Sequence, residues 1–168
     1  STTDAPFQNN QIAIYEQLAK NYPDMTLVET FYGNDEQNAS LSCAETAMDK
    51  YPDLAGLLCP TTVAVAAAAQ AVSQRGVADK VHVQGCGTPN QMRQYIEDGT
   101  VSLSTLWNTY MEGYAGALLG YMIATGKVDP ADTSFEYEGT TFEFGPNGTL
   151  YAGAPLVMTK ENIADYNF

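Results

Sequence analysis

Apolar residues recur along the chain with helical spacing in some stretches and as short continuous runs in others. The first helical stretch carries Ile14, Leu18 and Tyr22 three to four residues apart, which places them on one helix face. An alanine-rich stretch further on ends at Gly76, and glycine commonly follows the end of a helix. The pattern predicts helices over residues 8–22, 34–51, 61–76, 88–99 and 109–126.

Short apolar runs between these helices predict strands, of which residues 54–59 (LAGLLC) are wholly apolar. A wholly apolar strand is typical of a parallel sheet that is covered on both faces. Strands that alternate with helices predict an α/β fold with a doubly wound parallel sheet and flanking helices. The pattern opens with a helix, so we expect the first strand of the unit to lie in a longer protein. The predicted strands cover residues 25–32, 54–59, 80–85 and 101–107.

The last part of the chain has a different pattern. Residues 135–153 (FEYEGTTFEFGPNGTLYAG) alternate between apolar and polar positions and contain glycine and asparagine, which predicts a hairpin or an irregular excursion. Residues 160–168 predict a short helical turn at the end.

Charge and composition narrow the class of ligand. Twenty acidic and seven basic residues give a net charge of −13, which argues against nucleic acid and against anionic membrane surfaces. A neutral polar ligand remains compatible with this charge. The longest apolar stretch is interrupted at Pro60, Thr61 and Thr62, so we expect no membrane insertion. No export signal opens the chain, and any such signal would lie upstream.

The reactive side chains do not form a catalytic set. His82 is the single histidine and lies inside a predicted strand, and neither a nucleophile triad nor a pair of carboxylates falls at the strand ends. The three cysteines, Cys43, Cys59 and Cys86, have no metal-ligand spacing and are read as buried free thiols, although Cys59 and Cys86 would be close if their strands are neighbours. We therefore expect no enzyme activity, no metal and no cofactor.

Ligands of open α/β sheets bind beyond the carboxyl ends of the strands. Four junctions qualify here: residues 2–9, 59–62, 85–88 and 105–108. They offer backbone amides, hydroxyls, the Asp4 carboxylate, the aromatic rings of Phe7 and Trp107, and the Asn108 amide. Directional hydrogen-bonding groups together with a flat apolar ring suit a small polyhydroxylated molecule.

Several of these residues also have a purely structural interpretation. Asp4 is equally suited to cap the helix that begins near Phe7, and Trp107 is equally suited to a core position. Gly87 belongs to a tight turn in which glycine permits a close backbone approach. Thr88 has the sequence of a capping box, with proline at the first helical position and Gln91 placed to reach back.

Three motifs resemble a known family: GTPNQMRQYIEDGTV, TLWNTYMEGYAGALLGYMIATGK and TKENIADYNF. They are similar to the extracytoplasmic solute-binding proteins of bacterial sugar ABC transporters, and most of all to the autoinducer-2 and rhamnose-binding branch. The resemblance runs from about Gln8 to Phe168 and covers the second half of a full-length member.

The resemblance implies one lobe and part of another in a type I periplasmic-binding-protein fold. Residues 1–105 would form the main part of the C-terminal ligand-binding lobe, without its first strand. Residues 106–130 would form the hinge crossing and a helix of the N-terminal lobe, and residues 131–168 would return to pack on the C-terminal lobe. The N-terminal half, in the same or a separate chain, would complete the pocket.

The resemblance also implies ligand contacts. A family proline falls on Pro60, and a backbone contact that is made by an alanine in the autoinducer-2 binders falls on Thr62. The Asp-Gln pair of those proteins is best matched by Asp4 with Phe7 or Gln8. Together with the junctions, the expected ligand-binding residues are Asp4, Phe7, Gln8, Pro60, Thr61, Thr62, Gly87, Trp107 and Asn108.

The expected function is therefore that of an extracytoplasmic receptor, in the periplasm or lipid-anchored to a Gram-positive cell surface. It would close on a small neutral sugar or sugar-like molecule and deliver it to an ABC permease. The alternative is the sugar-sensing effector domain of a cytoplasmic transcriptional regulator, which shares this fold. An upstream export signal with a lipidated cysteine would distinguish the first from the second, which would carry a helix-turn-helix.

Overall fold

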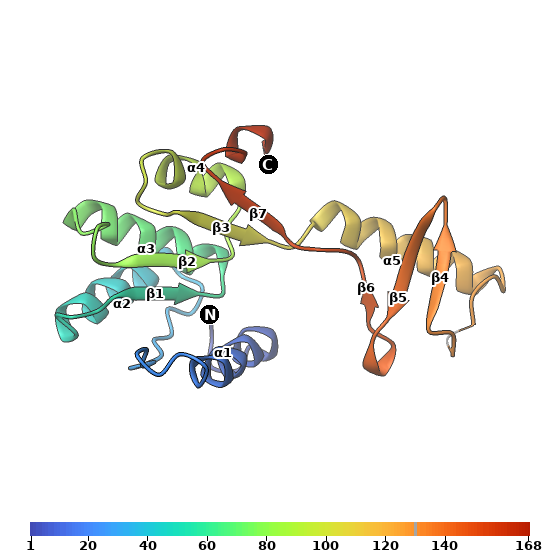
Figure 1. The fold of residues 1–168 in the computed structure, drawn as a ribbon, viewed down its shortest axis with the longest axis horizontal. Helices are drawn as coiled ribbons and strands as arrows, with labels where there is room; N and C mark the ends of the chain where they lie inside the picture. The colour runs from blue at the N-terminus through green and yellow to red at the C-terminus, as the bar shows by residue number, and fades with distance from the viewer. Residues whose placement is uncertain (130) are drawn as a thin grey trace. The chain divides into compact units, whose positions relative to one another are not determined.

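A computed structural model describes residues 1–129 and 131–168 and divides the chain into two compact units (Figure 1). The first unit contains Ser1–Thr105 and Val157–Phe168, and the second contains Leu106–Leu156. Of the segment 131–168, the part up to Leu156 thus lies in the second unit, and the remainder lies in the first. No helix among the described residues is long and apolar enough to cross a membrane.

The first unit is built on a short parallel sheet. Strand β1 (Gly56–Cys59) pairs in parallel with β2 (His82–Gly85), with Cys59 opposite Gly85. A parallel bridge between Cys86 and Thr105 connects β2 to β3 (Leu103–Leu106). Strand β3 in turn pairs with β7 (Leu156–Thr159). This confirms the predicted parallel α/β architecture and three of its four predicted strands.

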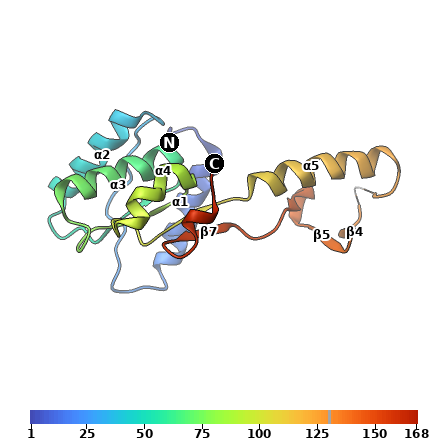
Figure 2. The ribbon, with the colours of Figure 1, turned by 90° about the horizontal axis from the view of Figure 1, so that it is seen from above.

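Helices cover this sheet, and α3 contributes more buried residues to the core than any other element of the unit. Because α3 is rich in alanine, its backbone lies close to β1 and β2 and also packs on α2 and α4 (Figures 1 and 2). Helix α3 ends at Gly76, which adopts the left-handed conformation with φ of 65°, as the sequence predicted. The helices of this unit are α1 (Pro6–Ala19), α2 (Gln37–Lys50), α3 (Thr62–Arg75) and α4 (Pro89–Glu97), followed near the end of the chain by the short 3-10 helix η2 (Ile163–Asp165).

The second unit has its own core between one helix and a small antiparallel sheet. Phe135 and Phe142 stack with ring centroids 5.0 Å apart, and Ala115, Leu118 and Met122 of the helix pack against them. The predicted hairpin is confirmed, because the two strands that carry these phenylalanines pair in antiparallel fashion. The elements are α5 (Thr109–Ala124), β4 (Ser134–Tyr137), β5 (Thr140–Phe144), the 3-10 helix η1 (Pro146–Gly148) and β6 (Leu150–Tyr151).

The prediction of a strand over residues 25–32 is wrong. None of these residues belongs to a strand, and Met25, Leu27 and Val28 are 64%, 45% and 49% exposed. The sequence has strong β-propensity, but a strand also needs a neighbour that pairs with its backbone groups. No described segment takes that place.

Two expectations about burial are also wrong. Helix α1 has no buried residue, and Ile14 and Leu18 of its predicted core face are 44% and 50% exposed. Strand β1 buries only Cys59, and its Leu58 is 46% exposed. The physical reason is the same in both cases: β1 is an edge strand here, and an apolar face is buried only where a further layer covers it.

Candidate functional site

The register of the sheet brings two predicted junctions to one edge. Cys59 ends β1, and its carbonyl accepts a hydrogen bond of 3.1 Å from the N–H of Cys86, which follows β2. The next N–H, of Gly87, donates to the carbonyl of Thr105 at 3.0 Å. The loops that leave β1 and β2 therefore begin side by side at the carboxyl edge of the sheet.

The N-terminal stretch lies at the same edge. Burial raises the pKa of Tyr15 on α1, and the Cys86 and Cys59 thiols raise it further, so Tyr15 lies in the neighbourhood of the ends of both strands. Figure 1 shows the N-terminus beside the tip of β1. Three of the four predicted junctions are thus brought together within the first unit.

The residues of this stretch are positioned by a turn rather than by a side-chain cap. Ala5 is the N-cap of α1 and makes no side-chain cap bond, so the alternative in which Asp4 caps the helix is wrong. The Asn9 side-chain amide instead donates to the Thr3 carbonyl at 2.9 Å and holds the turn. Asp4 is exposed, and Phe7 beyond it is 56% exposed. Asp4 is thereby left exposed just before the start of α1.

In the loop from β1 to α3, Thr61 caps the helix, and the residues on either side of it are partly exposed. The Thr61 hydroxyl is buried and accepts a hydrogen bond of 3.1 Å from the N–H of Ala64, so Thr61 caps α3. Pro60 and Thr62 are half-buried on either side of it. The first N–H groups of a helix have no partner within the helix. The N–H groups of Thr62 and Val63 at the start of α3 are therefore able to donate to a hydroxyl oxygen of a ligand.

We expect Thr61→Ala to lower the free energy of unfolding by about 1 kcal/mol, the usual cost of removing a threonine N-cap. Thr62→Ala is the matched control, because Thr62 lies one position further along α3 and has no cap role, and it should change stability far less. Urea unfolding followed by circular dichroism measures both. Equal losses for the two variants would contradict the assignment of the cap to Thr61.

In the loop from β2 to α4, two glycines allow close packing against neighbouring residues. A Cβ at Gly85 would lie 2.0 Å from the Cys59 carbonyl oxygen, and a Cβ at Gly87 would lie 2.4 Å from the Met92 side chain. Both glycines are therefore needed for close packing, and the Gly87 N–H is already used. The predicted capping box is wrong in part: Pro89 does occupy the start of α4, but the Thr88 hydroxyl donates to the Gln91 side-chain oxygen at 2.8 Å and caps no N–H.

Trp107 and Asn108 follow β3 and belong to the second unit. Asn108 is the N-cap of α5, and its side-chain oxygen accepts from the Met111 N–H at 3.1 Å. Trp107 is 43% exposed, which argues against the alternative of a core tryptophan. The contribution of these two residues to one site with Asp4 and Thr62 stays a prediction.

Two residues of α1 were not singled out from the sequence. Gln11 has a buried side-chain oxygen with no hydrogen-bond partner in the described structure, and Tyr15 lies one turn further along, close to Cys59 and Cys86. The four-residue spacing of two polar groups on a helix that faces strand ends is the signal that could have found them.

The thiols differ in reactivity according to burial. Burial raises the pKa of Cys59 to about 12, while Cys43 and Cys86 are only half-buried. Only the thiolate reacts, so the raised pKa of Cys59 and its burial both protect it. We expect Ellman's reagent to label the two half-buried thiols, Cys43 and Cys86, in the folded chain and Cys59 only after unfolding. Equal labelling rates for all three thiols would contradict this.

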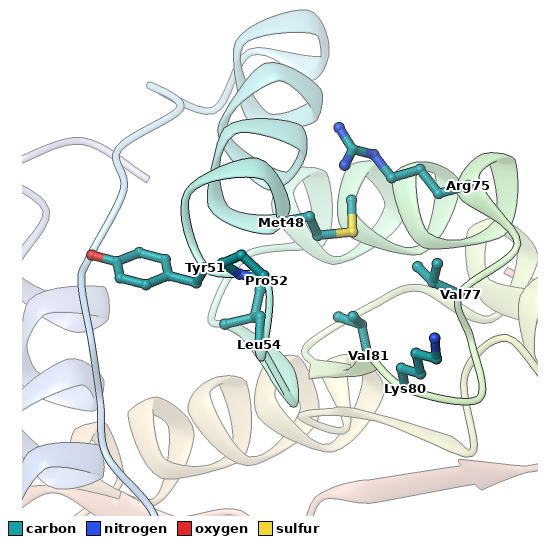
Figure 3. A pocket seen from close by; sticks show the side chains of 8 residues that line it. All are labelled: Met48, Tyr51, Pro52, Leu54, Arg75, Val77, Lys80 and Val81. Carbon is teal, nitrogen blue, oxygen red and sulfur yellow. The ribbon is translucent and has the colours of Figure 1, made fainter.

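A pocket at the opposite edge of the sheet does not compete for the ligand (Figure 3). Its cavity volume of about 190 Å³ is below the roughly 300 Å³ at which small-molecule sites begin. Arg75 at its rim is already paired with Asp49 of α2 at 2.7 Å. The lining residues are Met48, Tyr51, Pro52, Leu54, Arg75, Val77, Lys80 and Val81.

The polar groups near the carboxyl edge are of kinds that can hydrogen-bond to a ligand. His82 is exposed at the start of β2, the end of that strand remote from the candidate site. Among residues 1–129 and 131–168, no three His, Cys, Asp or Glu side chains are grouped to hold a metal ion. The carboxyl edge instead presents amides, hydroxyls, one carboxylate and a phenyl ring, which can hydrogen-bond and stack but do not form a nucleophile–base pair.

Comparison with known proteins finds a family model and several solved structures that match this chain. The family model described as periplasmic binding protein domain matches residues 1–128. A solved structure described as a sugar ABC transporter, from Actinomyces odontolyticus, is 31% identical with a TM-score of 0.89, and the match covers 100% of this chain and 55% of that chain.

Two further solved structures contain bound ligands. LsrB from Clostridium saccharobutylicum, in complex with AI-2, is 26% identical with a TM-score of 0.80, and the match covers 96% of this chain and 55% of that one. A solute-binding protein from Clostridium phytofermentas, with bound L-rhamnose, is 26% identical with a TM-score of 0.86, over 99% of this chain and 57% of that one. The chain thus spans little more than half the length of these relatives.

Proposed function

The chain belongs to the periplasmic binding protein domain family, and on this basis we propose that it forms the C-terminal ligand-binding lobe, with a hinge segment, of a receptor for a small neutral sugar or sugar-like molecule. The observation that carries the proposal is the convergence of the N-terminal stretch, the β1–α3 loop and the β2–α4 loop at one carboxyl edge. The groups presented there suit a ligand with several hydroxyls.

The ligand class follows from the charges and shapes at this edge. The net charge of −13 disfavours phosphorylated or strongly anionic ligands, because like charges repel. Phe7 is 56% exposed and follows the exposed Asp4 by three residues. We favour a ligand of the rhamnose, pentose or autoinducer-2 type, in line with the ligands of the relatives. Thr62, where the resemblance leads us to expect alanine, makes autoinducer-2 the less favoured of these.

The proposed mechanism is closure around the ligand. The chain passes between its two units at residues 105–106 and again at 156–157, and both passages would serve as parts of a hinge. A ligand that contacts both lobes stabilises the closed form by its differential contacts. The further partners in this proposal are an N-terminal half that completes the pocket and an ABC permease that accepts the sugar, both at an extracytoplasmic location.

A thermal-shift screen of the full-length protein tests the proposal. The ligands are L-rhamnose, pentoses, hexoses, deoxysugars and autoinducer-2, each at a concentration about 100-fold above a micromolar Kd. Binding to the folded state alone then adds about 2.7 kcal/mol of stability, which corresponds to an upward Tm shift of several degrees.

The variant Asp4→Asn tests the predicted ligand contact, because it keeps the size of the side chain and removes its charge. In the proposed receptor this variant unfolds at the same temperature without sugar but shows a smaller shift with it. A folded full-length protein that none of the sugars stabilises would overturn the proposed function.

A further inference from the structure

Three residues form a row across the carboxyl edge of the first unit's sheet. Strand β1 pairs with β2 so that Cys59 lies opposite Gly85, and the Cys86 N–H donates to the Cys59 carbonyl at 3.1 Å. Continuing this register places Pro60 beside Cys86. The parallel bridge to β3 places Thr105 on the other side of Cys86. Pro60, Cys86 and Thr105 therefore follow one another across the ends of β1, β2 and β3.

The side chains of Cys86 and Thr105 lie on the face of the sheet opposite α4. A Cβ on Gly87 would meet the side chains of Met92 in α4 and of Ser104 in β3, so Gly87 and Ser104 face α4. Side chains alternate between the two faces of a strand, so Cys86 and Thr105 point to the other face. Their contact agrees with this, because the Cys86 Sγ lies 3.9 Å from the Thr105 Oγ1.

At this junction, Cys86 has a side chain available to a ligand, whereas Gly87, which the sequence singled out, has none. The Gly87 N–H donates to the Thr105 carbonyl at 3.0 Å, and Met92 fills the space beside its Cα. Pro60, Cys86 and Thr105 are each half-buried, at the edge where ligands of open α/β sheets bind. Cys86 therefore presents its thiol next to Pro60, a residue already expected to contact the ligand.

Helix α1 adds polar groups near this row. Burial raises the pKa of Tyr15, and the Cys86 thiol raises it further, so Tyr15 lies in the neighbourhood of Cys86. Gln11 lies one turn earlier on the same helix face, and its side-chain oxygen is buried without a hydrogen-bond partner among the described residues. A buried acceptor without a donor is unfavourable, and a ligand hydroxyl is a donor that would satisfy it.

We propose that the row Pro60–Cys86–Thr105 and Gln11 of α1 form one wall of the sugar site, in which the Cys86 thiol packs against the sugar and the Gln11 oxygen accepts a hydrogen bond from one of its hydroxyls. This rests on the proposed function, to which it adds two ligand-contacting residues. A thiol is a small and weakly polar group, so it suits a C–H edge of the sugar ring. The Thr105 hydroxyl beside it suits a neighbouring hydroxyl of the sugar.

Protection of the thiol by the ligand tests the wall in the full-length protein. The sugar is L-rhamnose, or whichever sugar of the thermal-shift screen gives the largest shift. At 100 times its Kd only about one molecule in a hundred is free, so iodoacetamide should label Cys86 about 100-fold more slowly, as measured by peptide mass spectrometry. Cys43 of α2 is the internal control, because it is also half-buried, and its rate should not change.

The labelling has a clear contrary result. A Cys86 thiol that reacts at the same rate with and without a sugar that binds would overturn the proposal. A Cys86 thiol that does not react in the sugar-free protein would overturn it as well, because a ligand could not reach it either.

Closure of the lobes would also shield Cys86 without touching it, and substitutions distinguish the two cases. Cys86→Leu adds bulk at the contact and should weaken binding at least about 10-fold, whereas Cys86→Ser keeps the size of the side chain and should bind almost as the parent does. Cys43→Leu is the control and should bind as the parent does. Isothermal titration measures all three. A folded Cys86→Leu protein with the parent's affinity would contradict the contact.

Chemical modification gives the same test without refolding, in case Cys86→Leu does not fold. Methyl methanethiosulfonate adds a methylthio group to Cys86 of the folded Cys43→Ser protein, and this group should weaken binding as leucine does. Unchanged affinity of the modified protein would overturn the contact.

Gln11→Met tests the second contact, because it keeps the length of the side chain and removes the oxygen. We expect the affinity for the sugar to fall about 5- to 10-fold, the usual loss for one hydrogen bond. The Tm without sugar should not fall, since the oxygen has no partner there. Gln17→Met, at an exposed position of α1, is the control and should change neither quantity. A lower Tm with an unchanged affinity would assign Gln11 a structural partner and contradict its place in the wall.

The proposed function and this wall fail in different ways. A protein that no sugar stabilises would refute the receptor, and the wall with it. A protein that a sugar stabilises, with Cys86 unprotected and the affinities of Cys86→Leu and Gln11→Met unchanged, would retain the receptor and refute only the wall.

Discussion

Gly85→Ala is expected to destabilise the first unit by about 3 kcal/mol, the upper range for forcing an atom into a packed core. The added Cβ would lie 2.0 Å from the Cys59 carbonyl oxygen and 2.9 Å from the carbonyl carbon. Both are backbone atoms of the neighbouring strand, so neither can move away by changing a rotamer. The substitution must push β1 and β2 apart at the point where their register defines the candidate site.

Urea unfolding of the 168-residue chain, followed by far-UV circular dichroism, measures the effect. Gly99→Ala is the control: Gly99 has a φ of +84° and no atom within 4 Å of an added Cβ, so this variant should cost only about 1 kcal/mol for its left-handed backbone. A Gly85→Ala variant no less stable than Gly99→Ala would show that β1 and β2 are not paired in the observed register.

Trp107→Ala in the full-length protein is expected to weaken sugar binding by about 1–3 kcal/mol, the usual range for truncating an aromatic anchor. The reason is the position of the indole, which follows the end of β3 directly and is 43% exposed in the second unit. A flat apolar ring next to the Asn108 side chain can stack on one face of a sugar. Isothermal titration with the sugar identified by thermal shift measures the change.

The matched control is Tyr151→Ala, which removes another large exposed aromatic side chain (56% exposed) from the same unit. It should leave the affinity unchanged. A Trp107→Ala variant that binds as tightly as the parent protein, with an unchanged Tm, would remove Trp107 from the site.

The sequence predicted the alternation of elements well, because the relevant interactions are local. The alanine-rich helix that ends at Gly76 and the hairpin around Glu138 and Gly139 both occur where their patterns indicated. Gly76 and Gly139 have positive φ, which glycine adopts without strain.

The errors fall where the outcome depends on distant partners. Residues 25–32 have a strand sequence but no ladder, and Ile14 and Leu18 of α1 have a helical spacing but no layer to cover them. Strand pairing and burial are tertiary properties, so the local pattern cannot determine them. The predicted capping box at Thr88 is wrong because the Thr88 hydroxyl donates to the Gln91 side-chain oxygen and not to a backbone group.

For the candidate site, the strand-end rule identified the loops correctly but not the role of each residue. It placed Thr61 among the ligand contacts, whereas the structure uses its hydroxyl to cap α3. It drew attention to Gly87, whose lack of a Cβ makes room for Met92. It overlooked Gln11, because the burial of one amide oxygen depends on how a helix is rotated against the sheet.

The first unit is assembled from both ends of the chain. Its C-terminal piece returns to α4, where the Asn90 N–H donates to the Phe168 carbonyl at 3.2 Å and Arg93 donates to the carbonyl of Tyr166. The second unit, by contrast, is one uninterrupted stretch. During translation, the whole second unit is therefore synthesised before the last residues of the first unit, Val157–Phe168, leave the ribosome. The unit that carries the candidate site is the last to mature and depends longest on whatever protects nascent chains.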